Sequence, residues 1–258
     1  MPTYVVTGAS SGIGLEVVRQ LAARGDKVFA TVRKRENSAT GEDFISNIAG
    51  DVTVVEGIDV SKDDVGARLA ASALAGVVIN GIIHNAGGFN GARDEEKDMS
   101  GQMKDQQLGG VSADRMISAF NLNCVGVLRV QQALGPQIAD NSGKVMVISS
   151  GLGSIGDNGS GGMYAYRASK AAVNMVSKGM AMDLKKRGIS VVTFNPAMVV
   201  TFFAGKNKEA MERMGAMPVE VSCSQLLKCL DDLNIDNTGR FMTAKNDNSG
   251  PLPFSAGW

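Results

Sequence analysis

The sequence predicts an α/β protein with one doubly wound, mostly parallel sheet of about seven strands and helices on both faces. Short apolar runs alternate with segments of helical spacing along nearly the whole chain. The runs are apolar at successive positions, as expected for parallel strands that are buried on both faces. The 258 residues show no linker and no internal repeat, so we expect a single domain over 1–258. The expected strands are 4–6, 28–32, 52–55, 81–84, 144–149, 189–194 and 240–243.

The first strand leads into a glycine-rich turn and then into a helix. Thr7 and Gly8 close the strand, Gly12 and Gly14 follow, and a helical pattern then runs to Gly25. In this context the backbone can approach a pyrophosphate closely, and the helix N-terminus offers N–H groups and a positive dipole end. The alternative interpretation is an ordinary strand-to-helix turn.

The second strand ends in a basic segment. Where an NAD-binding unit places an acidic residue for the ribose hydroxyls, this chain has Thr31 and Val32, followed by Arg33, Lys34 and Arg35. No carboxylate repels a 2′-phosphate here, and three cations can meet it. The segment favours NADP over NAD, with a solvated basic loop as the alternative.

Three further polar turns follow expected strands. Asp59 can accept a hydrogen bond from an adenine amino group, or it can cap the helix that is expected to begin near Lys62. Asn85, Ala86 and Gly87 follow the strand at 81–84, and an Asn-Pro-Ala turn follows the strand at 189–194. Ligands of doubly wound sheets bind beyond the carboxyl ends of the strands, which is where all these turns lie.

Other segments are less regular. Residues 42–48 and 113–139 have helical patterns, and the second contains Asn121 and Asn123, which need hydrogen-bond partners if they are buried. Residues 88–112 are rich in glycine and charge, and we expect an exposed loop that shapes a site mouth or a subunit contact. Residues 198–217 show loop-like and helical spacing, and the tail to 258 shows little regular pattern.

Composition excludes several classes of function. The formal net charge is zero, which gives no indication of binding to nucleic acid or to an anionic membrane surface. No run approaches the roughly 18 apolar residues of a spanning helix, and the N-terminal residues do not resemble a signal peptide. Three cysteines without metal-like spacing suit a reducing, cytoplasmic location, and we expect no metal site. His84 is the only histidine, which argues against a Ser-His-Asp hydrolase unless His84 is its base.

Tyr166 and Lys170 are the strongest catalytic candidates. Their spacing of four places them on one face of a helix. A nearby cation favours the phenolate and lowers the tyrosine pKa, so that a phenol can exchange a proton with a carbonyl or alcohol oxygen. Ser150, at the end of the strand at 144–149, can hold the same oxygen. A tyrosine and a lysine at this spacing are nonetheless most often ordinary helix residues.

The ordered set of motifs resembles the short-chain dehydrogenase/reductase family over about residues 1–205. The set comprises T-G-x-x-x-G-I-G, D-V, N-A-G, an Asn in the long helix, I-S-S, Y-x-x-S-K and N-P-x-x-V-x-T. The segment GSIGDNGSGGMYAYRASKAAVNM is most similar to C-factor and sniffer-type carbonyl reductases. The resemblance implies a Rossmann-type fold, with a cofactor-binding part over about 1–150 and a catalytic and substrate-binding part over about 150–258.

The resemblance also implies roles for individual residues. The catalytic set would be Asn123, Ser150, Tyr166 and Lys170, with Ser149 as a competitor for the serine role. Lys170 would also bind the nicotinamide ribose, and Asn123 would hold a water that relays protons to Lys170. The expected cofactor contacts are Gly8, Ser10, Ser11, Gly12, Ile13, Gly14, Arg33, Asp59, Val60, Asn85, Ala86, Gly87, Tyr166, Lys170, Pro196, Val199 and Thr201.

The implied activity is NADPH-dependent reduction of a ketone or aldehyde to an alcohol, with a homodimer or homotetramer expected by analogy. Two features depart from the family pattern. Pro196-Ala197 replaces the common Pro-Gly at a turn expected to face the nicotinamide, and residues 157–162 lengthen the loop between Ser150 and Tyr166. The alternatives are an NAD-dependent alcohol dehydrogenase, another enzyme with the same catalytic set, and a non-catalytic NADP-binding signalling protein.

Overall fold

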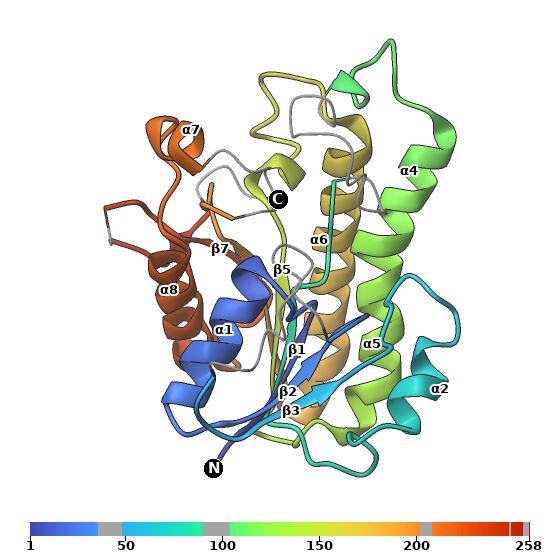
Figure 1. The fold of residues 1–258 in the computed structure, drawn as a ribbon, viewed down its shortest axis with the longest axis vertical. Helices are drawn as coiled ribbons and strands as arrows, with labels where there is room; N and C mark the ends of the chain where they lie inside the picture. Colours follow the sequence, from blue (N-terminus) through green and yellow to red (C-terminus); the bar gives the residue numbers. More distant parts are fainter. Residues whose placement is uncertain (36–47, 90–103, 202–207, 248, 255–257) are drawn as a thin grey trace.

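The fold is a single α/β domain around one eight-stranded sheet (Figure 1). The computed structural model describes residues 1–35, 48–89, 104–201, 208–247, 249–254 and 258. Seven strands pair in parallel in the order β3-β2-β1-β4-β5-β6-β7, and β8 pairs antiparallel with β7 at the edge. The strands are β1 (Thr3–Thr7), β2 (Lys27–Thr31), β3 (Val52–Val55), β4 (Gly81–His84), β5 (Lys144–Ile148), β6 (Ser190–Asn195), β7 (Arg240–Thr243) and β8 (Leu252–Pro253).

Helices cover both faces of the sheet, because alternate residues of each strand point to opposite sides. Val6 of β1 belongs to a core with α1 (Gly12–Ala23) and α8 (Val219–Asp232), whereas Val5 belongs to a core with α2 (Val65–Ala70) and the long helices. Those long helices are α5 (Gly126–Leu134) and α6 (Tyr164–Leu184), and α4 (Ala113–Phe120) packs against α6. Figure 1 shows the sheet between the two layers. The predicted doubly wound fold is confirmed.

The strand order reverses direction at β1 and β4, which are neighbours in the sheet. The connection after β1 leads towards β2 on one side, and the connections after β4 lead towards β5 on the other. Loops leaving the carboxyl ends of two such strands diverge and leave a crevice for a ligand. This edge, which we call the carboxyl edge of the sheet, therefore positions the candidate site.

The helix predicted over 113–139 is interrupted by a π-helical turn. Ser112 caps its start by accepting a hydrogen bond from the Arg115 N–H at 3.2 Å. Residues Asn121–Val125 are π-helical, and the Gly126 N–H bonds to the Asn121 carbonyl five residues back. Such turns insert one extra residue into a helix and are frequent at functional sites. The helix then continues as α5 and closes in a 3₁₀ turn at Gly135–Gln137.

Several elements differ from expectation. The sequence analysis noted helical spacing within 198–217, where α7 (Lys208–Arg213) lies, but it did not anticipate α8 or the short edge strand β8 in the tail. The helix expected at 42–48 lies almost wholly outside the described residues, as do residues 90–103 of the 88–112 segment. Most described residues at 104–112 are exposed, as expected, but Gln106 is fully buried.

The three cysteines are buried thiols without disulfide bonds. None of the helices that the structure describes has both the length and the apolar character needed to cross a bilayer. The described residues also contain no cluster of three or more His, Cys, Asp or Glu side chains suited to a metal ion.

Candidate active site

The glycine-rich turn after β1 packs so closely against the turn after β4 that Gly8 and Gly14 leave no room for a side chain. A Cβ built on Gly14 would lie 2.4 Å from the Gly8 carbonyl oxygen and 2.4 Å from the side-chain nitrogen Nδ2 of Asn85. A Cβ on Gly8, where φ is +66°, would lie 2.8 Å from Ala86 Cα. The two turns therefore depend on glycine for both space and backbone conformation.

Thr7 and Asn85 hold these turns together. The Thr7 hydroxyl accepts hydrogen bonds from the N–H groups of Asn85 at 3.0 Å and Ala86 at 3.1 Å. The Asn85 side chain in turn donates to the carbonyl oxygens of Thr7 and Gly8. This contact fixes the predicted residues Gly8, Asn85 and Ala86 at the carboxyl edge.

The N-terminus of α1 suits a phosphate group. Ser11 is the N-cap in an extended conformation, and the first internal bond runs from the Leu15 N–H to the Ser11 carbonyl. The N–H groups of Gly12, Ile13 and Gly14 precede that bond, so the helix itself provides no acceptor for them. Thr201 lies beside this turn, 3.6 Å from the position of a Cβ on Gly12. The glycine-lined space and the N–H donors fit the pyrophosphate of a dinucleotide.

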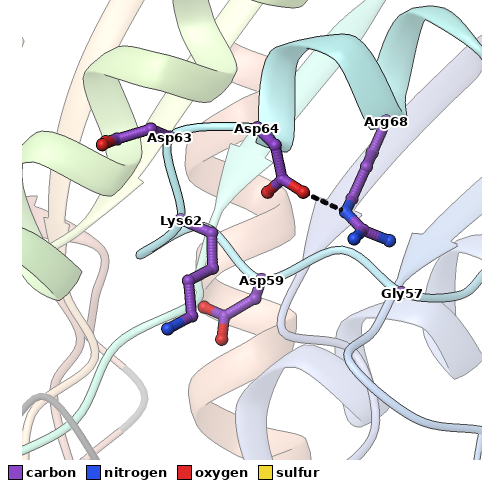
Figure 2. Close-up of a pocket in the computed structure, with 6 residues that line it drawn as sticks. All are labelled: Gly57, Asp59, Lys62, Asp63, Asp64 and Arg68. Atoms are coloured by element: carbon purple, nitrogen blue, oxygen red, sulfur yellow. Dashed lines mark hydrogen bonds and ion pairs between the residues drawn. The ribbon is translucent and has the colours of Figure 1, made fainter.

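Arg33 and Asp59 follow β2 and β3 at the same edge. Arg33 is exposed, and its charge reaches Asp59. Burial opposes ionisation of Asp59, but hydrogen bonds from Ser61 and the Arg33 charge outweigh it and lower the Asp59 pKa. The Asp59 carboxylate accepts from both the N–H and the hydroxyl of Ser61. It thus caps a turn before α2, which begins at Val65, and borders the surface hollow in Figure 2.

Other predicted cofactor residues have structural contacts of their own. Val60 is buried under α5, where a Cβ on Gly126 would come within 2.8 Å of it. The Pro196 carbonyl accepts a hydrogen bond from Ser222 of α8. Val199 is buried and pairs with Met217, while Ser10 is half-buried.

Ser150, Tyr166 and Lys170 meet above the ends of β4 and β5. The side chains of Ser150 and Tyr166 share a hydrogen bond, and the Lys170 ammonium lies 5.7 Å from the centre of the Tyr166 ring. Lys170 Nζ donates to the Ile148 carbonyl at 2.9 Å. A Cβ on Gly87 would lie 3.5 Å from that Nζ, so the turn after β4 is next to the lysine.

The expected lowering of the Tyr166 pKa does not occur. Burial raises the pKa of Tyr166 to about 12, although the hydrogen bond with Ser150 acts in the opposite direction. The ring of Phe89 packs on Tyr166 with 4.8 Å between ring centres, and the Lys170 ammonium is bound to a backbone carbonyl. Burial also lowers the pKa of Lys170 to about 8. The prediction from spacing alone did not include this desolvation.

Asn123 lies in the π-helical turn and is fully buried. Its amide donates to the Gly88 carbonyl at 2.8 Å and to the Ser169 hydroxyl at 2.9 Å, and its oxygen accepts from the Gly88 N–H. Ser169 in turn donates to the Tyr166 carbonyl. The Asn123 side chain therefore ties the turn after β4 to α6, and its two amide hydrogens are already used within the protein.

Ser149 and His84 have other partners. The Ser149 hydroxyl is buried and donates to the Asn174 side chain, whereas Ser150 is half-buried and bonds Tyr166. His84 is buried, bonds Gln131 at 3.0 Å, and has its pKa lowered by burial to about 4. A pKa of about 4 makes His84 a weak base, and its partner is the Gln131 amide, which argues against the hydrolase alternative.

The sequence analysis gave no role to three residues of the site, although the Y-x-x-S-K motif includes Ser169. Ser169 follows Tyr166 by three positions and so shares its helix face, a pattern that could have identified it. Phe89 and Gln106 come from the irregular 88–112 segment, where no periodicity indicated burial.

Comparison with known proteins finds a family whose sequence model matches most of this chain. The family model described as short chain dehydrogenase matches residues 2–212. A Rhodococcus sp. (strain AD45) protein, 1-hydroxy-2-glutathionyl-2-methyl-3-butene dehydrogenase, is 33% identical over 242 residues, covering 93% of this chain and 96% of the relative. The C-signal protein of Myxococcus xanthus is 35% identical over 135 residues, covering 52% of this chain and 77% of that protein.

Solved structures show the same fold. The NADPH-bound carbonyl reductase from chicken fatty liver superposes with a TM-score of 0.78 at 25% identity, covering 98% of this chain and 99% of that chain. The chain belongs to the short-chain dehydrogenase/reductase family, and it is an oxidoreductase of that family.

Ala197, which replaces the common glycine after Pro196, adopts a left-handed conformation with φ of +62°. Its N–H donates to the Asn195 side chain at 3.2 Å, which helps to hold the turn. An L-residue pays about 1–2 kcal/mol for this conformation, which glycine adopts freely.

We therefore expect Ala197→Gly to increase the free energy of unfolding by about 0.5–1 kcal/mol, after the larger unfolded-state entropy of glycine is subtracted. Urea denaturation measures this change. Ala23→Gly, on the exposed side of α1, is the control and should destabilise the protein by a similar amount. A loss of stability in Ala197→Gly would contradict the strain at this turn.

Proposed function

We propose that this protein reduces a ketone or aldehyde to an alcohol with NADPH as the hydride donor. The observation that carries the proposal is the convergence of Ser150, Tyr166 and Lys170 next to Gly87, at the carboxyl edge that also holds the Gly8–Gly14 turn. When bound, the cofactor would supply a hydride to the carbonyl carbon. The protein residues would orient the substrate and deliver the proton.

Tyr166 would donate its hydroxyl proton to the oxygen that becomes the alcohol. Burial raises the pKa of Tyr166 to about 12, so the phenol is protonated at neutral pH and carries the proton that reduction requires. Ser150, already bonded to Tyr166, would hold the same oxygen and stabilise its developing negative charge.

Lys170 and Asn123 would assist the proton transfer by Tyr166. The ammonium near the Tyr166 ring would stabilise the negative charge that develops on the phenol oxygen as its proton is delivered, and it would bind the nicotinamide ribose. The Asn123 side chain has both amide hydrogens engaged by Gly88 and Ser169, so a relay of protons through water would use the backbone of the π-helical turn.

The cofactor would be NADPH. The exposed Arg33, followed by Lys34 and Arg35, stands at the end of β2, where a ribose 2′-phosphate would need positive charge. The chicken carbonyl reductase, which is NADPH-bound, supports the same choice. Gly8, Ser10, Ser11, Gly12, Ile13, Gly14, Asp59, Val60, Asn85, Ala86, Pro196, Val199 and Thr201 remain the proposed contacts to the rest of the cofactor.

A second candidate is oxidation of an alcohol that carries a glutathionyl group. It is favoured by the Rhodococcus relative, whose name describes such a dehydrogenase and which aligns over 93% of this chain. The match to C-signal keeps a signalling role as the non-enzymatic alternative, but a binding protein has no need of the Ser150–Tyr166–Lys170 arrangement. Product analysis with each substrate class separates the two enzymatic functions.

Removal of the Tyr166 hydroxyl tests the proposed function. We expect Tyr166→Phe to lower NADPH-dependent turnover of an aldehyde and ketone panel by about 10²-fold or more, because the proton donor is lost. The dissociation constant for NADPH should change less than about twofold, since Gly8–Gly14 and Arg33 would bind the distant half of the cofactor. Tyr4→Phe removes a hydroxyl from the core at β1 and serves as the control with unchanged turnover. Full activity in Tyr166→Phe would reject the assignment.

The pH dependence of the reaction tests Lys170. The Lys170 pKa is lowered to about 8, so its ammonium is present below that pH and is lost above it, while Tyr166 stays protonated up to about 12. We expect kcat/KM for reduction to be level below about pH 8 and to fall above it, because kcat/KM reports ionisations of the unliganded enzyme. Lys170→Met should lack this inflection and have a low activity throughout. An inflection near 8 that persists in Lys170→Met would assign it to another group.

A further inference from the structure

The helix that carries Tyr166 lacks an N-cap of its own. Met163 occupies the N-cap position with φ of +52° and ψ of +34°, and its side chain makes no capping hydrogen bond. Gly161 and Gly162 before it also have positive φ values. An ordinary N-cap is extended and carries a Ser, Thr, Asp or Asn oxygen that accepts from the third helical N–H. In α6 that third residue is Tyr166.

Gln106 supplies the missing acceptors from another part of the chain. Its backbone carbonyl accepts from the Tyr164 N–H at 3.1 Å, and its side-chain oxygen accepts from the Tyr166 N–H at 2.8 Å. The two partners in the second bond are 60 residues apart in sequence. Gln106 is fully buried, so water does not compete for these bonds.

The side-chain nitrogen of Gln106 holds Phe89, whose ring packs on the ring of Tyr166. Gln106 Nε2 donates to the Phe89 carbonyl at 3.1 Å. The Phe89 ring packs on the Tyr166 ring at 4.8 Å between centres, with the planes inclined by 58°. One side chain thus holds both the backbone of Tyr166 and the residue whose ring contacts the phenol.

We propose that Gln106 is a positioning residue for the reaction, which caps α6 and fixes Phe89 so that the Tyr166 hydroxyl stays aligned with Ser150. The proposal rests on the proposed function for its effect on turnover. A general acid must be held close to its target geometry, and a displacement of about 1 Å can cost about 10²-fold in rate. We accordingly expect loss of both Gln106 side-chain bonds to lower kcat by about 10- to 100-fold.

Gln106→Met and Gln106→Glu separate the two contacts. Methionine keeps the approximate volume and loses both bonds. A glutamate keeps the acceptor for the Tyr166 N–H; burial favours its protonated form, which can still donate to the Phe89 carbonyl, and raising the pH ionises it and removes that donor. The matched control is Gln225→Met in α8, since Gln225 is also buried, accepts from the Lys245 N–H and donates to the Lys245 carbonyl. The readouts are kcat with NADPH, the NADPH dissociation constant, thermal stability, and hydrogen exchange of the Tyr166 amide.

In Gln106→Met we expect exchange of the Tyr166 amide to accelerate at least about tenfold and kcat to fall, with NADPH affinity unchanged within about twofold. Gln106→Glu should keep the amide protected and lose less of kcat. Gln225→Met should lose thermal stability to a similar extent without either effect. If Gln106→Met does not fold, Gln106→Glu decides alone: relative to wild type, its kcat should fall with rising pH as the carboxyl ionises and loses its bond to the Phe89 carbonyl, at unchanged NADPH affinity.

Wild-type kcat in both Gln106 variants, or a Tyr166 amide that exchanges equally fast in wild type and Gln106→Met, would overturn the inference. Failure of the proposed function is distinguishable, because it would appear in the wild-type protein as no NADPH-dependent reduction of any carbonyl in the panel. In that case amide exchange still decides whether Gln106 holds the first turn of α6.

Discussion

The buried Asn123 amide is the contact on which the rest of the site depends. It binds both backbone groups of Gly88 and the Ser169 hydroxyl, which itself bonds the Tyr166 carbonyl. Since each unsatisfied buried polar group costs about 1–3 kcal/mol, this set of bonds fixes the distance between the turn after β4 and α6. The π-helical turn places Asn123 in the helix at the position that meets both partners.

The parallel sheet explains why residues far apart in sequence meet at one edge. The residues that follow each parallel strand lie at the same carboxyl edge of the sheet. The reversal of strand order at β1 and β4 leaves room between the loops that follow these two strands. Gly8 packs against Ala86, and Gly87 lies next to the Lys170 ammonium. Lys170 in turn donates a hydrogen bond to the Ile148 carbonyl. The glycine-rich turn and the Tyr166 helix therefore form parts of one continuous site.

The sequence was sufficient to predict this edge, because its motifs directly follow apolar strands whose order a doubly wound fold constrains. Ser150, Tyr166 and Lys170 lie together as their positions predicted, and Ser150 bonds Tyr166 whereas Ser149 bonds Asn174. Gln106 and the raised Tyr166 pKa were not predictable in this way. The capping bond joins residues 60 positions apart, and the raised pKa follows from burial of Tyr166, whose ring also contacts Phe89. Both arise from packing of an irregular segment, which leaves no periodic pattern in the sequence.

The most direct test of the account is the fate of the hydride. Enzyme would be mixed in a single turnover with an aldehyde or ketone and NADPH deuterated at the transferred position of the nicotinamide, and in parallel with deuterated NADH. We expect deuterium on the carbinol carbon of the product, a slower single turnover with the deuterated cofactor, and a preference for NADPH. Alcohol formed without deuterium, or no alcohol at all from any carbonyl, would contradict direct hydride transfer at this site.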